Sequence, residues 1–223
     1  MRLIKFAAIV QDNKAFFIVY TALLLLGLYP LLAWDKVTLL LMINGQHHPA
    51  LDQCFYYITN LGSGITYTLL LITLLFLGIA NRKLLIGASS FVVTSAIVQS
   101  LKRIVFPDQL RPIELVSDPT QLHLVDHVAI LSHLSFPSGH AATIFTAACL
   151  LNLTTPIKHI LYSILLLLIA TIVAYSRVYL CQHFYTDVYV GMLIGGLVTT
   201  FIYAWLIDWQ VPSWLEQRLP VKL

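Results

Sequence analysis

The residues best suited to chemistry in this 223-residue chain are two histidines that stand among serine, arginine, lysine and aspartate. His183 and Asp187 are four residues apart, so on a helix they share a face, and the carboxylate can accept a hydrogen bond from one ring nitrogen. That bond would fix the tautomer and leave the other nitrogen free for nucleophilic attack. For this pair taken alone, a satisfied helix end is the alternative interpretation.

The second histidine closes the stretch Pro137-Ser138-Gly139-His140, which comes directly before an apolar run. Ser138 is a typical helix N-cap, and Gly139 lets an anion approach the backbone. The first turn of a helix presents unpaired N–H groups and a positive dipole end, which together bind phosphate. Helix punctuation alone would explain the Pro-Ser-Gly part, but His140 adds a proton donor beside the anion site.

Cations accompany both histidines. Arg177 precedes His183 by six residues, and Lys102 and Arg111 follow another apolar run. The guanidinium fork of arginine offers bidentate hydrogen bonds to phosphate. Any one of these cations could simply meet lipid head groups, but that alternative accounts poorly for three cations together with two histidines.

The elements that must position these groups are membrane-spanning helices. The chain is 59% hydrophobic and 10% charged, and its mean hydropathy of +0.84 lies well beyond that of a soluble domain. Its formal charge of +3 is spread over loops and helix ends, which argues against nucleic acid as a partner. We expect a single domain over residues 1–223, with the catalytic motifs within 102–187, and the sequence predicts no oligomeric state.

The fold class that we expect is all-α, an integral membrane bundle of six transmembrane helices. About 20 residues cross the hydrocarbon core, and shorter runs can be completed by their flanking residues. The fourth and fifth of the six apolar runs are short or interrupted. The runs cover residues 15–33, 61–80, 84–101, 139–154, 160–175 and 188–207.

The basic residues predict the orientation of these spans, because lysine and arginine near span ends are retained in the cytoplasm. Those on one side are Arg2, Lys5, Lys14, Arg82, Lys83, Lys158, Arg218 and Lys222, and those on the other are Lys36, Lys102, Arg103, Arg111 and Arg177. We therefore expect both termini to be cytoplasmic. The three polar clusters then converge on the outer face of a bacterial inner (cell) membrane, towards the periplasm or exterior.

The long segment from Pro107 to Ser135 and the cysteines offer weaker signals. His123 and His127 stand at helical ligand spacing, but a catalytic metal usually needs a third ligand, so we expect no metal site and a solvated or head-group-facing loop. The three cysteines show no paired metal-ligand spacing. Free thiols are expected, with a Cys54–Cys181 disulfide as the alternative.

Taken together, the motifs resemble those of the type 2 phosphatidic acid phosphatase and haloperoxidase superfamily, and the six-span layout resembles its membrane branch. The signature of that family is a Lys…Arg-Pro element, a Pro-Ser-Gly-His element, and a Ser-Arg…His…Asp element. Residues 137–140 match the second, and 176–187 match the third without deviation. The first departs from the family pattern, because eight residues instead of six separate Lys102 from Arg111. This leaves open whether Lys102 or Arg103 points into the site, and we favour Lys102.

The resemblance implies a membrane lipid phosphatase that needs no cofactor. It implies that His183 is the nucleophile that forms a phosphohistidine, that Asp187 orients it, and that His140 protonates the leaving alkoxide. The residues implied to hold the phosphoryl oxygens are Lys102, Arg111, Ser138, Gly139 and Arg177. The expected substrate is a lipid phosphomonoester or diphosphate of the phosphatidic acid, phosphatidylglycerol phosphate, undecaprenyl diphosphate or lipid A type, with membrane lipids as the other partners. A catalytically silent scaffold or a transporter of the same fold is the alternative, although scaffolds tend to lose motif residues and transporters place polar groups near the membrane midplane.

Overall fold

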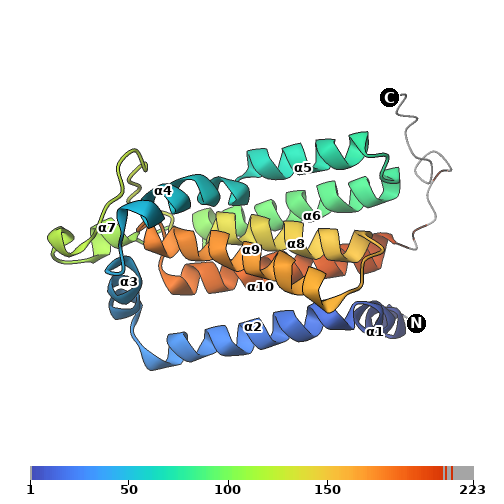
Figure 1. Cartoon of the computed structure of the whole chain (residues 1–223), viewed down its shortest axis with the longest axis horizontal. Coiled ribbons are helices and arrows are strands. Elements are labelled where there is room, and N and C mark those ends of the chain that lie inside the picture. Colours follow the sequence, from blue (N-terminus) through green and yellow to red (C-terminus); the bar gives the residue numbers. More distant parts are fainter. Residues whose placement is uncertain (1, 208, 210–211, 213–223) are drawn as a thin grey trace.

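A computed structural model describes residues 2–207, 209 and 212, and every regular element in that part of the chain is helical. Helices suit an apolar chain because all of their backbone hydrogen bonds are made within one segment. In chain order they are α1 (Arg2–Asp12), α2 (Lys14–Ala33), α3 (Lys36–Asn44), α4 (Pro49–Ile58), η1 (Thr59–Gly62), α5 (Gly64–Phe76), α6 (Asn81–Ser100), η2 (Leu101–Val105), α7 (Pro112–Leu115), η3 (Pro119–Gln121), α8 (Gly139–Thr154), α9 (Ile160–Tyr179) and α10 (Tyr185–Leu206). Figure 1 shows the long helices lying side by side, with α3, α4 and α7 at one end and α1 at the other.

The all-α membrane fold is confirmed, whereas the count of six spans stays a prediction. Four stretches are long and apolar enough to cross a bilayer: Lys14–Ala33, Asn81–Val105, Ile160–Tyr179 and Tyr185–Leu206. A fifth span would be the pair Pro49–Gly62 and Gly64–Phe76, which is bent by 60°. The bend falls at Ser63, whose hydroxyl caps α5 by accepting a hydrogen bond from the Thr66 N–H at 3.1 Å. The expected sixth span, α8, has only 16 residues.

Helix α8 is surrounded by protein. Thirteen of its 16 residues are buried, among them several small ones. A Cβ atom at Gly191 of α10 would lie 2.5 Å from the Ser138 carbonyl oxygen, and one at Gly195 would meet the Ala142 carbonyl oxygen. Glycines at these two positions therefore let α8 and α10 approach backbone to backbone, as small residues do in membrane bundles.

The three polar clusters lie at one end of the bundle. They are carried by the end of α6 with η2, the start of α8, and the connection from α9 to α10. The 107–135 segment, which contains α7, lies at the same end in Figure 1, opposite α1. Arg218 and Lys222 of the orientation argument are outside the described residues. The single-domain prediction also remains a prediction.

The structure also describes the three cysteines and the expected loop histidine His123. Cys54, Cys149 and Cys181 are free thiols. His123 lies 3.0 Å from a carboxylate oxygen of Asp52 and stacks on His47 with ring centroids 3.9 Å apart. Among the residues that the structure describes, no three histidine, cysteine or acidic side chains are grouped as metal ligands.

Candidate active site

The turn between α9 and α10 fixes the position of His183. The Arg177 carbonyl oxygen accepts hydrogen bonds from the N–H groups of Gln182 at 2.9 Å and His183 at 3.1 Å, which ends α9 in a tight turn. Within that turn Cys181 adopts a positive φ of 54°. Helix α10 then begins at Tyr185, so His183 stands between two helices and Asp187 lies in the first turn of the second.

His183 and Asp187 form the predicted pair. The Nδ1 atom of His183 lies 3.3 Å from Oδ2 of Asp187, and the side chains are buried to 2% and 5% exposure respectively. The same oxygen accepts hydrogen bonds from the Phe184 N–H at 3.1 Å and from the Ser135 hydroxyl. Three donors on one oxygen hold the carboxylate in place, and the bond to Nδ1 leaves Nε2 of His183 available for attack.

The start of α8 lies directly beside this pair. The Ser138 N–H donates to the Asp187 carbonyl oxygen at 2.8 Å, and its hydroxyl caps α8 by accepting from the Ala141 N–H at 3.4 Å. A Cβ atom at Gly139 would meet only Val98, at 3.8 Å, so no neighbouring atom requires a glycine there. The absence of a Cβ leaves the first helical turn open to an anion.

His140 follows Gly139 on the first turn of α8 and is only partly buried. It borders a cavity of about 690 Å³ between α5, α6 and α8. The lining of this cavity is mainly apolar, with hydroxyl and amide groups from Ser95, Gln99 and Thr143. His140 therefore faces a space large enough for part of a lipid.

Lys102, rather than Arg103, faces the cluster. The Nζ atom of Lys102 donates to the carbonyl oxygens of Leu134 at 2.5 Å and Ser135 at 3.1 Å, and the side chain is buried. The Arg103 side chain is exposed, and its Nε donates to the Gln99 side chain at 3.1 Å. Lys102 belongs to the π-helical turn η2, a local irregularity that is frequent at functional sites.

The two arginines are held by Gln182 and by the loop. Arg111 donates to the carbonyl oxygens of His133 at 2.9 Å and Gln182 at 2.6 Å. Arg177 donates to the Thr59 hydroxyl at 2.8 Å and to the Gln182 side chain at 3.4 Å. Within the described part of the chain, the buried Nε of Arg177 has no hydrogen-bond partner, which leaves a donor for an anion.

The charges around the site act on the nucleophile. Burial lowers the pKa of His183 well below its usual value, and Arg111, Arg177 and Lys102 lower it further. Burial also lowers the pKa of Arg111, while Asp187 raises it. The site thus combines a neutral imidazole with clustered positive charge, which suits attack on a phosphate and stabilisation of the charge that develops.

Three contributors were missed from the sequence. Ser135 donates to Asp187, Gln182 contacts both arginines, and Thr59 contacts Arg177. The 132–135 stretch of the long loop also supplies backbone carbonyls to Lys102 and Arg111. In the sequence, Ser135 and Gln182 could be recognised only by their positions next to the two histidine motifs. No pattern pointed to Thr59.

Comparisons with known proteins identify the family. A sequence model of the PAP2 superfamily matches residues 83–210, which include every residue of the predicted site. A lipid A 4'-phosphatase from Porphyromonas gingivalis is 24% identical over 170 residues, which are 74% of this chain and 70% of that protein. An undecaprenyl-diphosphatase from Sulfolobus acidocaldarius is 40% identical over 91 residues, but these cover only 41% of this chain and 40% of that protein.

Two solved structures share the fold. LpxE from Aquifex aeolicus superimposes with a TM-score of 0.65 and 32% identity, covering 76% of this chain and 96% of that one. A transmembrane PAP2-type phosphatidylglycerolphosphate phosphatase from Bacillus subtilis gives a TM-score of 0.62 at 21% identity, covering 89% and 98%. The expected resemblance to the membrane branch is thereby confirmed, and the protein is an integral membrane protein.

Proposed function

Because the chain belongs to the PAP2 superfamily, we propose that His183, His140 and the surrounding cations form the active site of a membrane lipid phosphatase. The observation that carries the proposal is the pairing of a buried, oriented nucleophile with three cations: His183 is hydrogen-bonded to Asp187, and Lys102, Arg111 and Arg177 are close enough to shift its pKa. The expected enzyme class, a phosphoric ester hydrolase, agrees with the family.

The first chemical step is transfer of the phosphoryl group to His183. The Nε2 atom attacks phosphorus as the bond to the lipid oxygen breaks, and the Nδ1–H bond to Asp187 stabilises the positive charge that the ring acquires. His140 gives a proton to the departing oxygen, so the lipid leaves as a neutral alcohol, or as a protonated phosphate when the substrate is a diphosphate.

The second step hydrolyses the phosphohistidine. Water attacks phosphorus, His140 accepts the proton of that water, and the P–N bond breaks to regenerate neutral His183 and release inorganic phosphate. Throughout both steps Lys102, Arg111 and Arg177, with Ser138 and the Gly139 N–H, hold the three phosphoryl oxygens. These cations neutralise charge as a metal ion does in other phosphatases, and we expect no cofactor.

The cavity beside His140 supports a lipid as the leaving group. It adjoins the proton donor, and its walls on α5, α6 and α8 are mostly apolar. The relatives act on lipid A and on undecaprenyl diphosphate by their names, so we propose a lipid phosphomonoester or diphosphate of these types, or of the phosphatidic acid or phosphatidylglycerol phosphate type.

The test is release of inorganic phosphate by the purified full-length protein from the four lipid classes in detergent. Activity on at least one of them, with inhibition by orthovanadate as a mimic of the five-coordinate transition state, is the expected result. Activity should survive prolonged chelation. Failure to hydrolyse any of the four, in a protein that remains folded, would overturn the proposal.

We also propose that the site faces the periplasm or exterior and that the termini are cytoplasmic, on the basis of the basic-residue distribution. Cysteines placed at the exposed positions Asp118 and Pro156, one at each end of the bundle, test this in a cysteine-free background. In intact cells an impermeant thiol reagent should label the Asp118 position and spare the Pro156 position. The reverse pattern would invert the orientation.

A further inference from the structure

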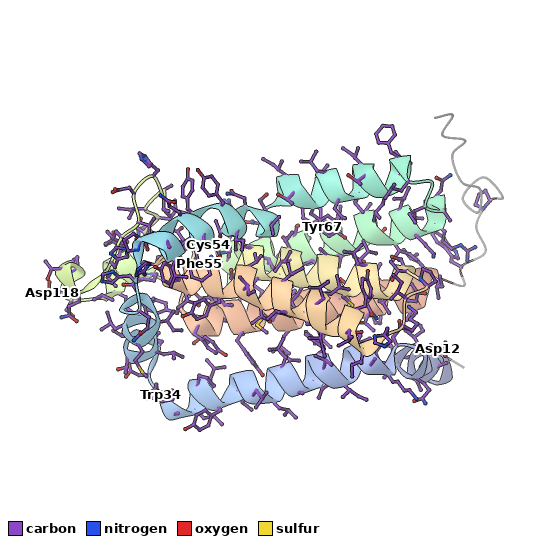
Figure 2. The ribbon with its side chains drawn as sticks, in the orientation of Figure 1. Asp12, Trp34, Cys54, Phe55, Tyr67 and Asp118 are labelled. Carbon is purple, nitrogen blue, oxygen red and sulfur yellow. The ribbon has the colours of Figure 1, made fainter. Side chains whose placement is uncertain are left out.

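A second group of basic and polar side chains lines a cavity of about 220 Å³ at the opposite end of the bundle from the histidines. In Figure 2, Asp12 marks this end and Asp118 marks the end that carries the outer loop. His140 and Thr154 lie near opposite ends of α8, so about 20 Å separates the two sites. The lining residues with polar groups in their side chains are Asp12, Asn13, Lys83, Thr154, Thr155, Lys158 and Tyr203.

Two lysines converge on this cavity from different elements. The Nζ atom of Lys158 donates to Oδ1 of Asn13 at 2.7 Å and to the Asn152 carbonyl oxygen at 2.6 Å. The Nζ atom of Lys83 donates to the Thr154 carbonyl oxygen at 2.5 Å. An ammonium group has three N–H donors, so among the described contacts one donor of Lys158 and two of Lys83 remain for a ligand.

A buried polar network fixes the position of Lys158. Its acceptor Asn13 is 6% exposed and receives a second hydrogen bond from Nδ2 of Asn152 at 3.2 Å. Asn152, which is 1% exposed, accepts in turn from the Ser163 hydroxyl at 3.2 Å. The side chains that support the cavity are therefore ordered jointly by Asn13 at the junction of α1 and α2, by α8 and by α9, and they hold the ammonium group of the otherwise exposed Lys158 in place.

The charge of the cavity is incompletely balanced. Asp12 is the one carboxylate among the described residues that line it, against two ammonium groups. Burial lowers the pKa of Lys158, and the neighbouring Lys83 lowers it further, whereas Asp12 raises it. An anion with several acceptor oxygens would relieve the repulsion between the lysines and use their remaining donors.

Capping of α8 is the simpler explanation for these lysines, since both donate to carbonyl oxygens in its last turn. It accounts for one hydrogen bond from each lysine. It does not account for the cavity between them, nor for the buried Asn13–Asn152 support beneath Lys158.

We propose that this cavity binds the phosphate of an anionic phospholipid from the membrane leaflet opposite the catalytic histidines. Its volume is below that of ordinary small-molecule sites, which fits a single phosphate group. Basic pockets between transmembrane helices bind lipid head groups. The exposed side chains of Ile157 and Ile160 flank Lys158 in the chain and offer an apolar surface for an acyl chain, which a free phosphate ion would not use.

The experiment compares phosphatidylglycerol binding by the full-length wild type and the variant Lys83→Gln/Lys158→Gln in nanodiscs of phosphatidylcholine doped with phosphatidylglycerol. This lipid is a phosphodiester, so it is distinct from a phosphomonoester substrate. Retained lipid is counted by native mass spectrometry, and affinity is measured by titrating the thermal midpoint. We expect the affinity to fall about tenfold or more, because charge-assisted hydrogen bonds are lost. Turnover of p-nitrophenyl phosphate should be unchanged, because the lysines lie far from the catalytic histidines.

Lys14→Gln is the control for the loss of a single charge and is matched to the single variant Lys83→Gln, because it removes one charge from an exposed position at the same end of the bundle. Equal binding by the wild type and the double variant, or an equal loss in the control, would overturn the proposal. Inorganic phosphate that stabilises the wild type as strongly as the lipid at equal concentration would make the free anion the ligand. If the double variant does not fold, the single variant Lys83→Gln is measured instead, because it removes only one hydrogen bond to the end of α8. Unchanged lipid affinity in that variant would refute the proposed site.

Discussion

The two histidines flank the same phosphate site in unlike surroundings. His183 is 2% exposed, is held by Asp187, and belongs to a turn whose backbone is tied to Arg177. His140 is partly buried, stands on the first turn of α8, and borders the 690 Å³ cavity. The first region is closed and held by hydrogen bonds to Asp187 and Arg177, whereas the second opens towards the part of the substrate that departs.

This difference separates what every substrate shares from what distinguishes one substrate from another. The phosphoryl group is common to all candidate lipids, and it meets the closed region around His183. The lipid portion varies, and it meets the open region around His140. Changes near His183 should therefore affect all substrates alike, and changes near His140 should depend on the leaving group.

Replacing His183 should have the largest effect. His183→Ala removes the nucleophile, so turnover of every substrate should fall on the order of 10⁴- to 10⁶-fold, as when a member of a catalytic triad is lost. The acid-labile phosphoenzyme should be absent when trapped under alkaline quench conditions. His159→Asn is a suitable control, because asparagine can keep the N-cap of α9 and the position is remote from the site. A phosphoenzyme that persists in His183→Ala would assign the nucleophile elsewhere.

The His140 prediction tests the open side of the comparison. His140→Ala removes a proton donor, so phosphorylation by a lipid phosphate should slow about 10² to 10⁴-fold. The loss should be much smaller with p-nitrophenyl phosphate, because its leaving group is already stable as an anion. Rapid-quench measurement of the phosphorylation step with the two substrates checks this. Equal losses for both would mean that His140 acts mainly in binding.

The sequence predicted the local parts of both regions well. The spacing of His183 and Asp187 fixes their relative position on a turn and a helix start, and Ser138 caps α8 as its residue type suggested. These interactions join residues within four positions of each other, so short-range geometry determines them. The roles inferred for these residues in catalysis remain predictions.

The long-range parts could not be predicted in this way. Ser135 reaches Asp187, and Arg111 reaches Gln182, through the path of an irregular loop that has no periodic pattern. Lys102 was favoured over Arg103 by family resemblance alone, and the turn η2 then places it inward. The predicted count of six spans includes α8 for a similar reason: protein surrounds α8, and hydropathy alone does not distinguish an apolar helix buried in protein from one that contacts lipid.

Ser135 offers a moderate effect on the closed region. Ser135→Ala removes one of the three donors to Oδ2 of Asp187, so His183 should be less well oriented and kcat should fall about 10- to 100-fold. KM should change little, because Ser135 is a positioning residue that does not hold the phosphoryl group. The thermal midpoint separates this from general destabilisation, and Ser132→Ala provides a control in the same loop. A change in KM alone would contradict the positioning role.

The pH dependence of the phosphorylation rate has the smallest expected effect. It tests directly whether His183 is shielded from solvent. Burial and three nearby cations lower the pKa of His183 well below its usual value of about 6.5. The neutral ring is the nucleophile, so activity is lost only when pH falls below this lowered pKa. An ordinary histidine would lose about tenfold of its neutral form between pH 7.5 and 5.5. With p-nitrophenyl phosphate, whose leaving group hardly needs the proton of His140, the phosphorylation rate corrected for ionisation of the substrate should instead change by no more than about twofold.

Arg111→Gln then sharpens the same measurement. Arg111 is the nearby cation with the largest effect on the pKa of His183, so its removal should shift the acid limb of the profile towards higher pH. The position of that limb is independent of the lower overall rate that follows from weaker phosphate binding, and so the two effects can be separated in one data set. An acid limb near pH 6.5 in the wild type, unmoved in Arg111→Gln, would show that His183 titrates like a solvent-exposed imidazole. The distinction between a closed nucleophile region and an open leaving-group region would then fail.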